Sequence, residues 1–178
     1  MRIEIDDNLY VRSIEENDAE ESYQLIINNK EYLSEWFGWV KNTKSVDTSL
    51  KYIKEIVEER NRDEGDDFII IMNEKMIGRI GYWFKNDFTV NMGYWLAEDK
   101  QGNGYVTRCC KAIIEHLFTI SSLHRLEIKV ADENIKSRAL IERLGLNFEG
   151  IMKDVDFRDG RYECEAVYSI LSTEFTGY

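Results

Sequence analysis

The stretch from Val106 to Phe118 constrains the fold of this 178-residue chain more than any other segment. Its apolar residues recur at positions i, i+3, i+4, i+7, i+8, i+11 and i+12, and they are Val106, Cys109, Cys110, Ile113, Ile114, Leu117 and Phe118. This spacing places all of them on one face of an α-helix. The stretch therefore predicts a strongly amphipathic helix, and a polar loop with two glycines comes directly before it.

The rest of the chain alternates between strand-like and helix-like patterns. A helix is expected to be capped near Asn17, with Glu20 three residues on as in a capping box, and a second helix to run from about Asp47 to Arg62. The stretch 28–44 is less regular, and the run 63–67 reads as a polar stop. Strands are predicted at 10–14, 68–72, 76–84, 90–96, 126–130, 148–157 and 163–171, and a short helix at 134–144.

The connections between the predicted strands are short. Residues 73–75 and 85–87 favour an antiparallel meander, and Asp159-Gly160 is a hairpin signal. The order of elements predicts a mixed α/β (α+β) fold, with a largely antiparallel sheet of about seven strands flanked by helices. Because no repeat or flexible linker interrupts the sequence, one domain is expected over residues 1–178.

The net charge of -11 excludes several classes of partner. Phosphate backbones and anionic membrane surfaces would repel so acidic a chain. The sequence has no apolar run of about 18 residues and no secretion signal at its start. Its three cysteines and two histidines lack metal-ligand spacing, so we expect a reduced, cytoplasmic protein without a metal.

The loop before the amphipathic helix is the most informative segment for function. Its sequence is Gln101-Gly102-Asn103-Gly104-Tyr105-Val106-Thr107. Unpaired N–H groups at a helix start, together with the helix dipole, attract anions, and glycines let an anion come close. The loop could therefore hold a phosphate or pyrophosphate, or it could be a helix entry without a ligand. Thr107 replaces the third glycine of a dinucleotide fingerprint, and a P-loop Gly-Lys-Ser/Thr is absent.

With these residues the sequence resembles the GNAT superfamily of acetyl-CoA-dependent N-acetyltransferases. Gln101, Gly104 and Val106 occupy the positions of its loop pattern Gln/Arg-x-x-Gly-x-Gly/Ala, with Val106 in place of the usual small residue. The resemblance covers about residues 9–171. It includes Leu9-Tyr10-Val11-Arg12, Gly93-Tyr94-Trp95-Leu96, Asn134-Ile135-Lys136-Ser137 and Leu144-Gly145-Leu146.

Within the superfamily the sequence is most similar to the RimL-type ribosomal-protein-serine N-acetyltransferases. The matching segments are Asn29-Lys30-Glu31-Tyr32-Leu33, Trp39, Glu149-Gly150-Ile151-Met152-Lys153 and the Asp159-Gly160 hairpin. The branch often forms dimers, so the resemblance implies a homodimer by analogy.

The resemblance also implies roles for particular residues. Asp156 stands where the branch has its general-base carboxylate as Glu, and Asp154, on the same face of the predicted strand, is the reserve candidate. The branch assigns the general acid to a serine that stands here at Ser137, whereas many other relatives have a tyrosine at the position of Ile141. The donor acetyl-CoA would be bound by the loop residues 101–107, by backbone near Leu96 and by Asn134. Residue types alone leave structural alternatives: a solvated strand residue for Asp156, and helix-capping roles for Ser137 and Asn134.

The acceptor is expected to be a primary amine. Neutralising a lysine at pH 7 costs about 3.5 kcal/mol more than neutralising an α-amine, which favours a protein N-terminus such as that of a ribosomal protein. A polyamine or aminoglycoside acceptor and a non-catalytic CoA-binding module remain as alternatives.

The aromatic tract 32–39 is expected to line either the acceptor site or the core. Cys109 and Cys110 need no catalytic role. Residues 97–145 carry eight bases and seven acids, so the acidity lies outside the segment expected to meet an anionic donor.

Overall fold

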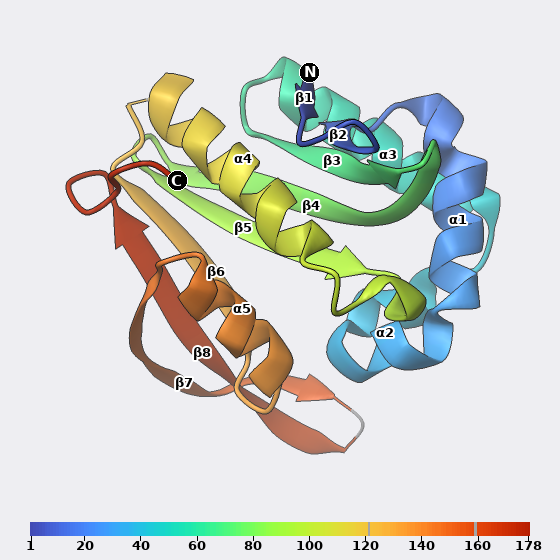
Figure 1. Cartoon of the computed structure of the whole chain (residues 1–178). Coiled ribbons are helices and arrows are strands. Elements are labelled where there is room, and N and C mark those ends of the chain that lie inside the picture. Colours follow the sequence, from blue (N-terminus) through green and yellow to red (C-terminus); the bar gives the residue numbers. More distant parts are fainter. Residues whose placement is uncertain (121, 159) are drawn as a thin grey trace. The chain divides into compact units, whose positions relative to one another are not determined.

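The computed structural model describes residues 1–120, 122–158 and 160–178 (Figure 1). They form two compact units, the first made of Met1–Trp83 and Tyr94–Cys109 and the second of Phe84–Gly93 and Cys110–Tyr178. The strands are β1 (Arg2–Glu4), β2 (Leu9–Ser13), β3 (Gly65–Met72), β4 (Lys75–Asn86), β5 (Thr89–Leu96), β6 (Arg125–Ala131), β7 (Asn147–Arg158) and β8 (Arg161–Leu171). The helices are α1 (Ala19–Asn28), α2 (Lys30–Trp36), α3 (Val46–Asn61), α4 (Tyr105–Ile120) and α5 (Ile135–Arg143), with 3-10 turns η1 (Glu16–Asp18), η2 (Gly38–Asn42) and η3 (Glu98–Lys100).

The first unit contains four antiparallel strands in the order β1-β2-β3-β4. The turn between β3 and β4 is tight because Asn73 and Glu74 both adopt positive φ, at 49° and 61°. Two successive residues of positive φ are typical of the hairpin turn whose twist matches that of the flanking strands. The short connection predicted at residues 73–75 is thereby confirmed as a hairpin turn.

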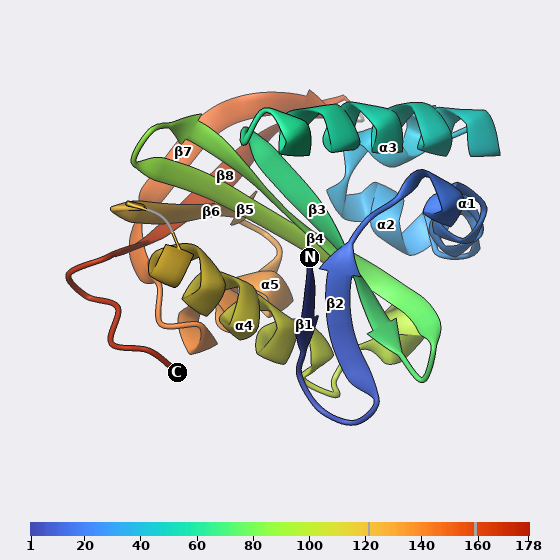
Figure 2. The same cartoon turned by 90° about the horizontal axis from the view of Figure 1, so that it is seen from above.

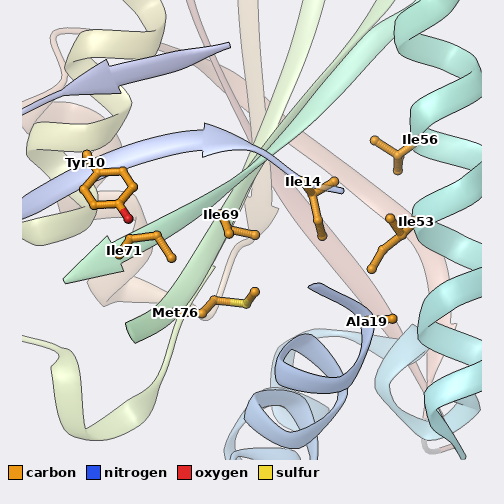
Figure 3. Packing of buried hydrophobic residues seen from close by; sticks show 8 residues of the cluster. All are labelled: Tyr10, Ile14, Ala19, Ile53, Ile56, Ile69, Ile71 and Met76. Carbon is orange, nitrogen blue, oxygen red and sulfur yellow. The ribbon is translucent and has the colours of Figure 1, made fainter. Parts of the chain in front are cut away.

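One face of this sheet is covered by α1 and α3 (Figure 2). Ile53 and Ile56 project from α3 toward Ile14, and Ala19 closes the cluster from α1 (Figure 3). The strands contribute Tyr10, Ile69, Ile71 and Met76 to the same cluster. Burial of these side chains is the main force that holds the two helices on the sheet.

The second unit is built on β6, which pairs in parallel with β5 and antiparallel with β8. The strand β7 pairs with β8 on that strand's other side. Helix α5 packs on one face of the sheet, where the Arg138 Nε donates to the Tyr168 hydroxyl over 2.9 Å. Tyr168 lies opposite Ile128 in the register, so the α5 face of β6 contains Leu126 and Ile128. Of the predicted hairpin pair, Asp159 lies outside the described residues, whereas Gly160 has a φ of 85°.

The structure confirms the expected mixed α/β class with a largely antiparallel sheet, and β5 with β6 is the parallel pair. Eight strands are described rather than about seven. The additional strand, β1, has only three residues, too few for a hydrophobic alternation to show in the sequence. The stretch 28–44, expected to be less regular, contains α2 and η2. The expectation of one domain stays a prediction.

Two boundary predictions were wrong. The capping box is formed by Glu15 and Asp18 around η1, not by Asn17 and Glu20, and α1 begins only at Ala19. The run 63–67 is not a polar stop throughout, because β3 begins at Gly65 and buries both following aspartates. Buried carboxylates require charged or hydrogen-bonding partners, and these come from distant segments that a local pattern does not reveal.

Candidate functional site

The glycine loop lies between η3 and α4 in the first unit. Gly102 and Gly104 adopt φ values of 78° and 72°, in the left-handed region that favours glycine. A Cβ built at either position would have no heavy atom within 4 Å. The backbone of the loop is therefore open to close approach by another group, as an anion-binding loop requires.

The N-terminus of α4 supplies donors directly after the loop. The Arg108 N–H donates to the Gly104 carbonyl over 3.1 Å, so the N–H groups of Tyr105, Val106 and Thr107 come before the first bond of this helix. The positive end of the helix dipole lies at the same place. The side chain of Val106 is only 6% exposed, so its larger size is accommodated in the core while its backbone N–H stays at the helix start. These residues fit a phosphate or pyrophosphate.

Two asparagine side chains hydrogen-bond the backbone of the loop and of the turn before it. The Asn103 Nδ2 donates to the carbonyls of Lys100 and Gln101 over 3.2 and 3.0 Å. The Asn29 Oδ1 accepts from the Glu98 N–H over 2.9 Å, which ties η3 to the end of α1. Burial raises the pKa of Tyr32, and a hydrogen bond with Gln101 acts in the opposite direction. The RimL-type resemblance includes both residues, and Tyr32 begins the aromatic tract 32–39 that was expected to line the acceptor site or the core, whereas Asn29 had no expected role.

Leu96 ends β5 beside a close contact with β4. A Cβ at Gly78 would overlap the Trp95 carbonyl and the Leu96 Cα, so only glycine lets the backbones lie this close. The Ala97 N–H donates to the Ile77 carbonyl over 2.8 Å. The backbone around Leu96 is therefore fixed in place just before the loop.

A cavity of about 400 Å³ opens beside the entry to the loop. Its walls come from α1, the start of β4 and η3, and include Asn29, Ile77 and Ala97. The cavity thus places open space next to the segment that leads into the anion-binding loop.

Asn134 and Ser137 belong to the second unit, at the N-terminus of α5. The Asn134 Oδ1 accepts the Ser137 N–H over 3.1 Å, which confirms the helix-capping role that residue types alone allowed for Asn134. Ser137 is half-buried in the first turn of the helix. Its position is thereby set by the cap that precedes it.

Asp156 lies on the exposed edge strand β7 of the second unit. Its Oδ1 accepts the N–H of Phe157 over 2.8 Å, and it lies opposite Glu163 in the register. The register shifts between Met152 and Asp156, and Asp154 adopts a φ of 54°. This irregularity interrupts the strand alternation from which the shared face of Asp154 and Asp156 was inferred, and the shared face stays a prediction. Backbone strain of this kind is found mostly in turns and functional segments.

The aromatic tract is divided between core and surface. Leu33 is fully buried with Val40 and Trp95, whereas Trp39 is 40% exposed, with its ring centroid 6.3 Å from that of Trp95.

Burial raises the pKa of Cys109 to about 12, which keeps its thiol protonated at neutral pH. Cys109 is therefore a core residue, as the helical pattern predicts.

The described part of the chain offers neither a metal site nor a membrane-spanning helix. Among those residues, no three His, Cys, Asp or Glu side chains gather in a way that would hold a metal ion. None of the helices over the same residues combines the length and apolar character needed to cross a membrane.

Comparison with known proteins places this loop and fold in a family. The family model described as Acetyltransferase (GNAT) domain matches residues 8–147. The chain is 30% identical, over 97% of its length and 96% of the relative's, to YdaF of Bacillus subtilis (strain 168), to which ribosomal N-acetyltransferase activity is provisionally ascribed. It is 28% identical to the ribosomal-protein-serine acetyltransferase of Escherichia coli (strain K12), over 94% of both chains.

A solved structure shares the fold. The RimL ribosomal L7/L12 alpha-N-protein acetyltransferase in complex with coenzyme A superposes with a TM-score of 0.92, covering 96% of this chain and 98% of that one at 23% identity. The family match includes the glycine loop and the start of α4, where the open backbone suits the phosphates of the donor. The chain belongs to the GNAT acetyltransferase family, and it is an acetyl-CoA-dependent N-acetyltransferase resembling the RimL-type enzymes.

Proposed function

We propose that this enzyme transfers the acetyl group of acetyl-CoA to the N-terminal α-amine of a protein, such as a ribosomal protein. The observation that carries the proposal is the similarity to a ribosomal-protein-serine acetyltransferase over 94% of both chains. A similarity that runs from end to end includes the segments outside the donor loop, on which the choice of acceptor depends. The donor loop itself is common to enzymes with many different acceptors.

The donor is proposed to bind along the loop and the start of α4. Backbone N–H groups from Gln101 to Thr107 would hold the pyrophosphate, since the glycine positions leave that backbone open. Backbone near Leu96 would bind the acetyl carbonyl. Asn134 is proposed to contact the pantetheine arm, although its Oδ1 also caps α5.

Direct transfer in a ternary complex is the proposed reaction course. The amine nitrogen attacks the thioester carbonyl, a C–N bond forms and the C–S bond breaks. Asp156 takes the proton that the amine loses, and Ser137 supplies one to the departing thiolate. A backbone N–H near Leu96 would stabilise the oxyanion, and Asp154 is the reserve base.

The protonation of the acceptor favours an α-amine. Its pKa of about 7.7–8.0 leaves a substantial neutral fraction at pH 7, whereas a lysine or polyamine nitrogen near 10.4 is almost entirely charged. An exposed aspartate at an edge strand suits the easier deprotonation. The acidic net charge of -11 would attract a basic ribosomal protein and a polyamine alike, so charge does not separate these acceptors.

An acceptor screen tests the proposal. Purified enzyme and acetyl-CoA are incubated with seryl- and alanyl-terminated peptides, spermidine and an aminoglycoside, and the products are identified by mass spectrometry. We expect acetylation of a peptide α-amine to be fastest. Faster acetylation of spermidine or the aminoglycoside would reject the protein acceptor, and parallel double-reciprocal plots would reject the ternary complex.

A further inference from the structure

The donor loop and the turn η3 before it lie mostly at the surface. Glu98 and Asp99 are exposed, and η3 lines the cavity of about 400 Å³, so open space runs along one side of this turn. The Asn103 side chain bonds the carbonyls of Lys100 and Gln101, which fixes the shape of the loop but not its place in the molecule. The position of the loop must therefore be set by contacts from other elements.

Asn29, at the junction of α1 and α2, provides such a contact from outside the loop. Its Oδ1 accepts the Glu98 N–H over 2.9 Å, and its Nδ2 donates to the Leu25 carbonyl over 2.9 Å. Both ends of the amide are thus in use, one on η3 and one on α1. A carboxylate at this position could accept from η3 but could not donate to α1. The Asn29 amide therefore forms a bridge from the end of α1 to the first residue of η3.

The bridge is anchored in an apolar cluster that consists of Ile26, Leu33, Val40 and Trp95. The Asn29 N–H donates to the Ile26 carbonyl over 3.1 Å, and the Asn29 carbonyl accepts the Leu33 N–H over 2.9 Å. Ile26 and Leu33 are 2% and 0% exposed, so buried residues hold the backbone that carries the Asn29 side chain. The bridge thus connects the core of the first unit with a turn at its surface.

The same cluster fixes the other end of the proposed donor site. Trp95 is buried in β5 directly before Leu96, whose backbone is proposed to bind the acetyl carbonyl. Glu98 follows two residues after Leu96 and three before Gln101, where the proposed pyrophosphate site begins. The bridge from Asn29 is therefore attached between the acetyl end and the pyrophosphate end of the donor site.

We propose that Asn29 is a positioning residue that sets the distance between the acetyl end and the pyrophosphate end of the acetyl-CoA site. It holds η3, and with it the donor loop, at a fixed place relative to the core of the first unit. A hydrogen bond between Tyr32 and Gln101 links α2 to the loop itself and supports the same arrangement. This role rests on the proposed binding of the donor and deepens it, since it names the residue that keeps an open loop in place.

Binding of two donors to the whole enzyme tests this role. Acetyl-CoA is measured by calorimetry, and S-acetylpantetheine, which lacks the pyrophosphate, by displacement of acetyl-CoA. Asn29→Ala should raise the acetyl-CoA Kd about fivefold or more, as the loss of a hydrogen bond predicts, and change the S-acetylpantetheine Kd by less than about twofold. Asn28→Ala is the matched control, because Asn28 lines the same cavity, and both Kd values should stay within about twofold of wild type. Equal weakening of both donors by Asn29→Ala, as a merely structural role predicts, or an unchanged acetyl-CoA Kd would overturn the role of Asn29.

Glu98→Pro tests the bridge from its other side, since proline lacks the N–H that Asn29 accepts. Glu98 is the first residue of η3, and Ala97 before it has φ -56° and ψ 141°, a conformation compatible with a following proline. Alone, Glu98→Pro should raise the acetyl-CoA Kd at least as much as Asn29→Ala, whereas Glu98→Ala keeps the N–H and should not. Added to Asn29→Ala, it should change the Kd by less than about twofold, because the bond is already lost. Additive losses would contradict the bridge.

Gly104→Val separates the role of Asn29 from the proposed donor site. Gly104 has a φ of 72°, so a β-branched residue there should distort the loop and weaken acetyl-CoA binding. Wild-type affinity in Gly104→Val would contradict the proposed donor site, and the role of Asn29 with it. Weakened binding in Gly104→Val but not in Asn29→Ala would overturn the role of Asn29 alone. Thermal unfolding confirms that each variant is folded, and failure of the wild-type enzyme on every acceptor would contradict only the proposed acceptor, since these Kd values require none.

Discussion

Both units bury acidic side chains, and Asp66 of the first unit differs from Glu127 of the second in how its oxygens are bonded. In the first unit, the Asp66 Oδ1 accepts from the Arg60 Nε over 2.8 Å, and its Oδ2 accepts from the Ser13 hydroxyl over 2.6 Å. In the second unit, Glu127 is similarly buried but leaves one oxygen without a hydrogen bond among the described residues. The Glu127 Oε1 lies instead 3.6 Å from the Lys129 ammonium, so an ion pair takes the place of the missing hydrogen bond.

Asp67, the neighbour of Asp66, belongs to a second cluster of buried polar groups. The Asp67 Oδ2 accepts from the Tyr52 hydroxyl over 2.8 Å and is paired with Arg79, which is itself buried. Tyr52 belongs to α3 and Arg79 to β4, so the cluster links a helix to two strands. The Arg79 Nε has no hydrogen-bond partner among the described residues, so the pairing of Arg79 with Asp67 carries its charge.

The largest effect is expected from Asp67→Asn. The substitution leaves the Arg79 guanidinium buried without its counter-charge, which should lower the free energy of unfolding by about 3–5 kcal/mol. Urea denaturation measures the loss. Glu127→Gln is the matched control and should cost less, because Arg125 keeps Glu149. Equal losses in the two variants would remove the distinction between the clusters.

Asp156→Ala tests an exposed carboxylate against the two buried ones. If Asp156 takes the proton of the amine, turnover should fall by about 10²-fold or more, while the acetyl-CoA Kd stays nearly unchanged. Steady-state kinetics and calorimetry measure the two quantities. Wild-type turnover in this variant would exclude Asp156 from the reaction and turn attention to Asp154.

Gly81→Ala probes the packing around Asp67. A Cβ at Gly81 would overlap the Asp67 Oδ1, so the added methyl should destabilise the enzyme by about 1–3 kcal/mol. Gly102→Ala is a useful contrast, since its Cβ would meet open space and any cost there comes from the positive φ. Thermal unfolding of the two variants compares them. Greater destabilisation by Gly102→Ala would show that the Asp67 cluster adapts easily.

The smallest effect concerns pH. Hydrogen bonds from Arg125 and Ser169 lower the pKa of Glu149 to about 2. A carboxylate with a depressed pKa contributes stability above its unfolded pKa near 4.5 and loses that contribution as pH falls toward 2. Glu149→Gln should therefore flatten the stability–pH curve between about pH 5 and 2. An unchanged slope, measured by urea denaturation at several pH values, would contradict this assignment.

Local patterns predicted much of the fold and the donor loop. The apolar face of α4 is buried as its spacing requires, including Cys109, Cys110 and Ile113. The glycines of the loop adopt the conformations for which glycine is suited. The errors arose where long-range partners decide the outcome, as in the polar run 63–67 that begins β3.

The acceptor side could not be predicted in the same way. Asp156 and Ser137 were chosen by resemblance to a family, and their roles remain proposals. The burial of Glu127 was not predicted either, because a single Glu in an alternating strand is usually solvent-exposed. Its burial becomes visible only when β8 and β7 bring Ser169 and Glu149 to the same arginine.

The sequence by itself determined the amphipathic helix, the glycine loop before it and the GNAT family, because these features depend on residues close together in the chain. Tertiary structure decided which carboxylates are buried and what each one is bonded to. Asp66 meets Ser13 across 53 positions and Glu149 meets Arg125 across 24. The cost of burying a charge is set by such distant partners, so the structure alone separates a carboxylate with both oxygens hydrogen-bonded from one that relies on an ion pair.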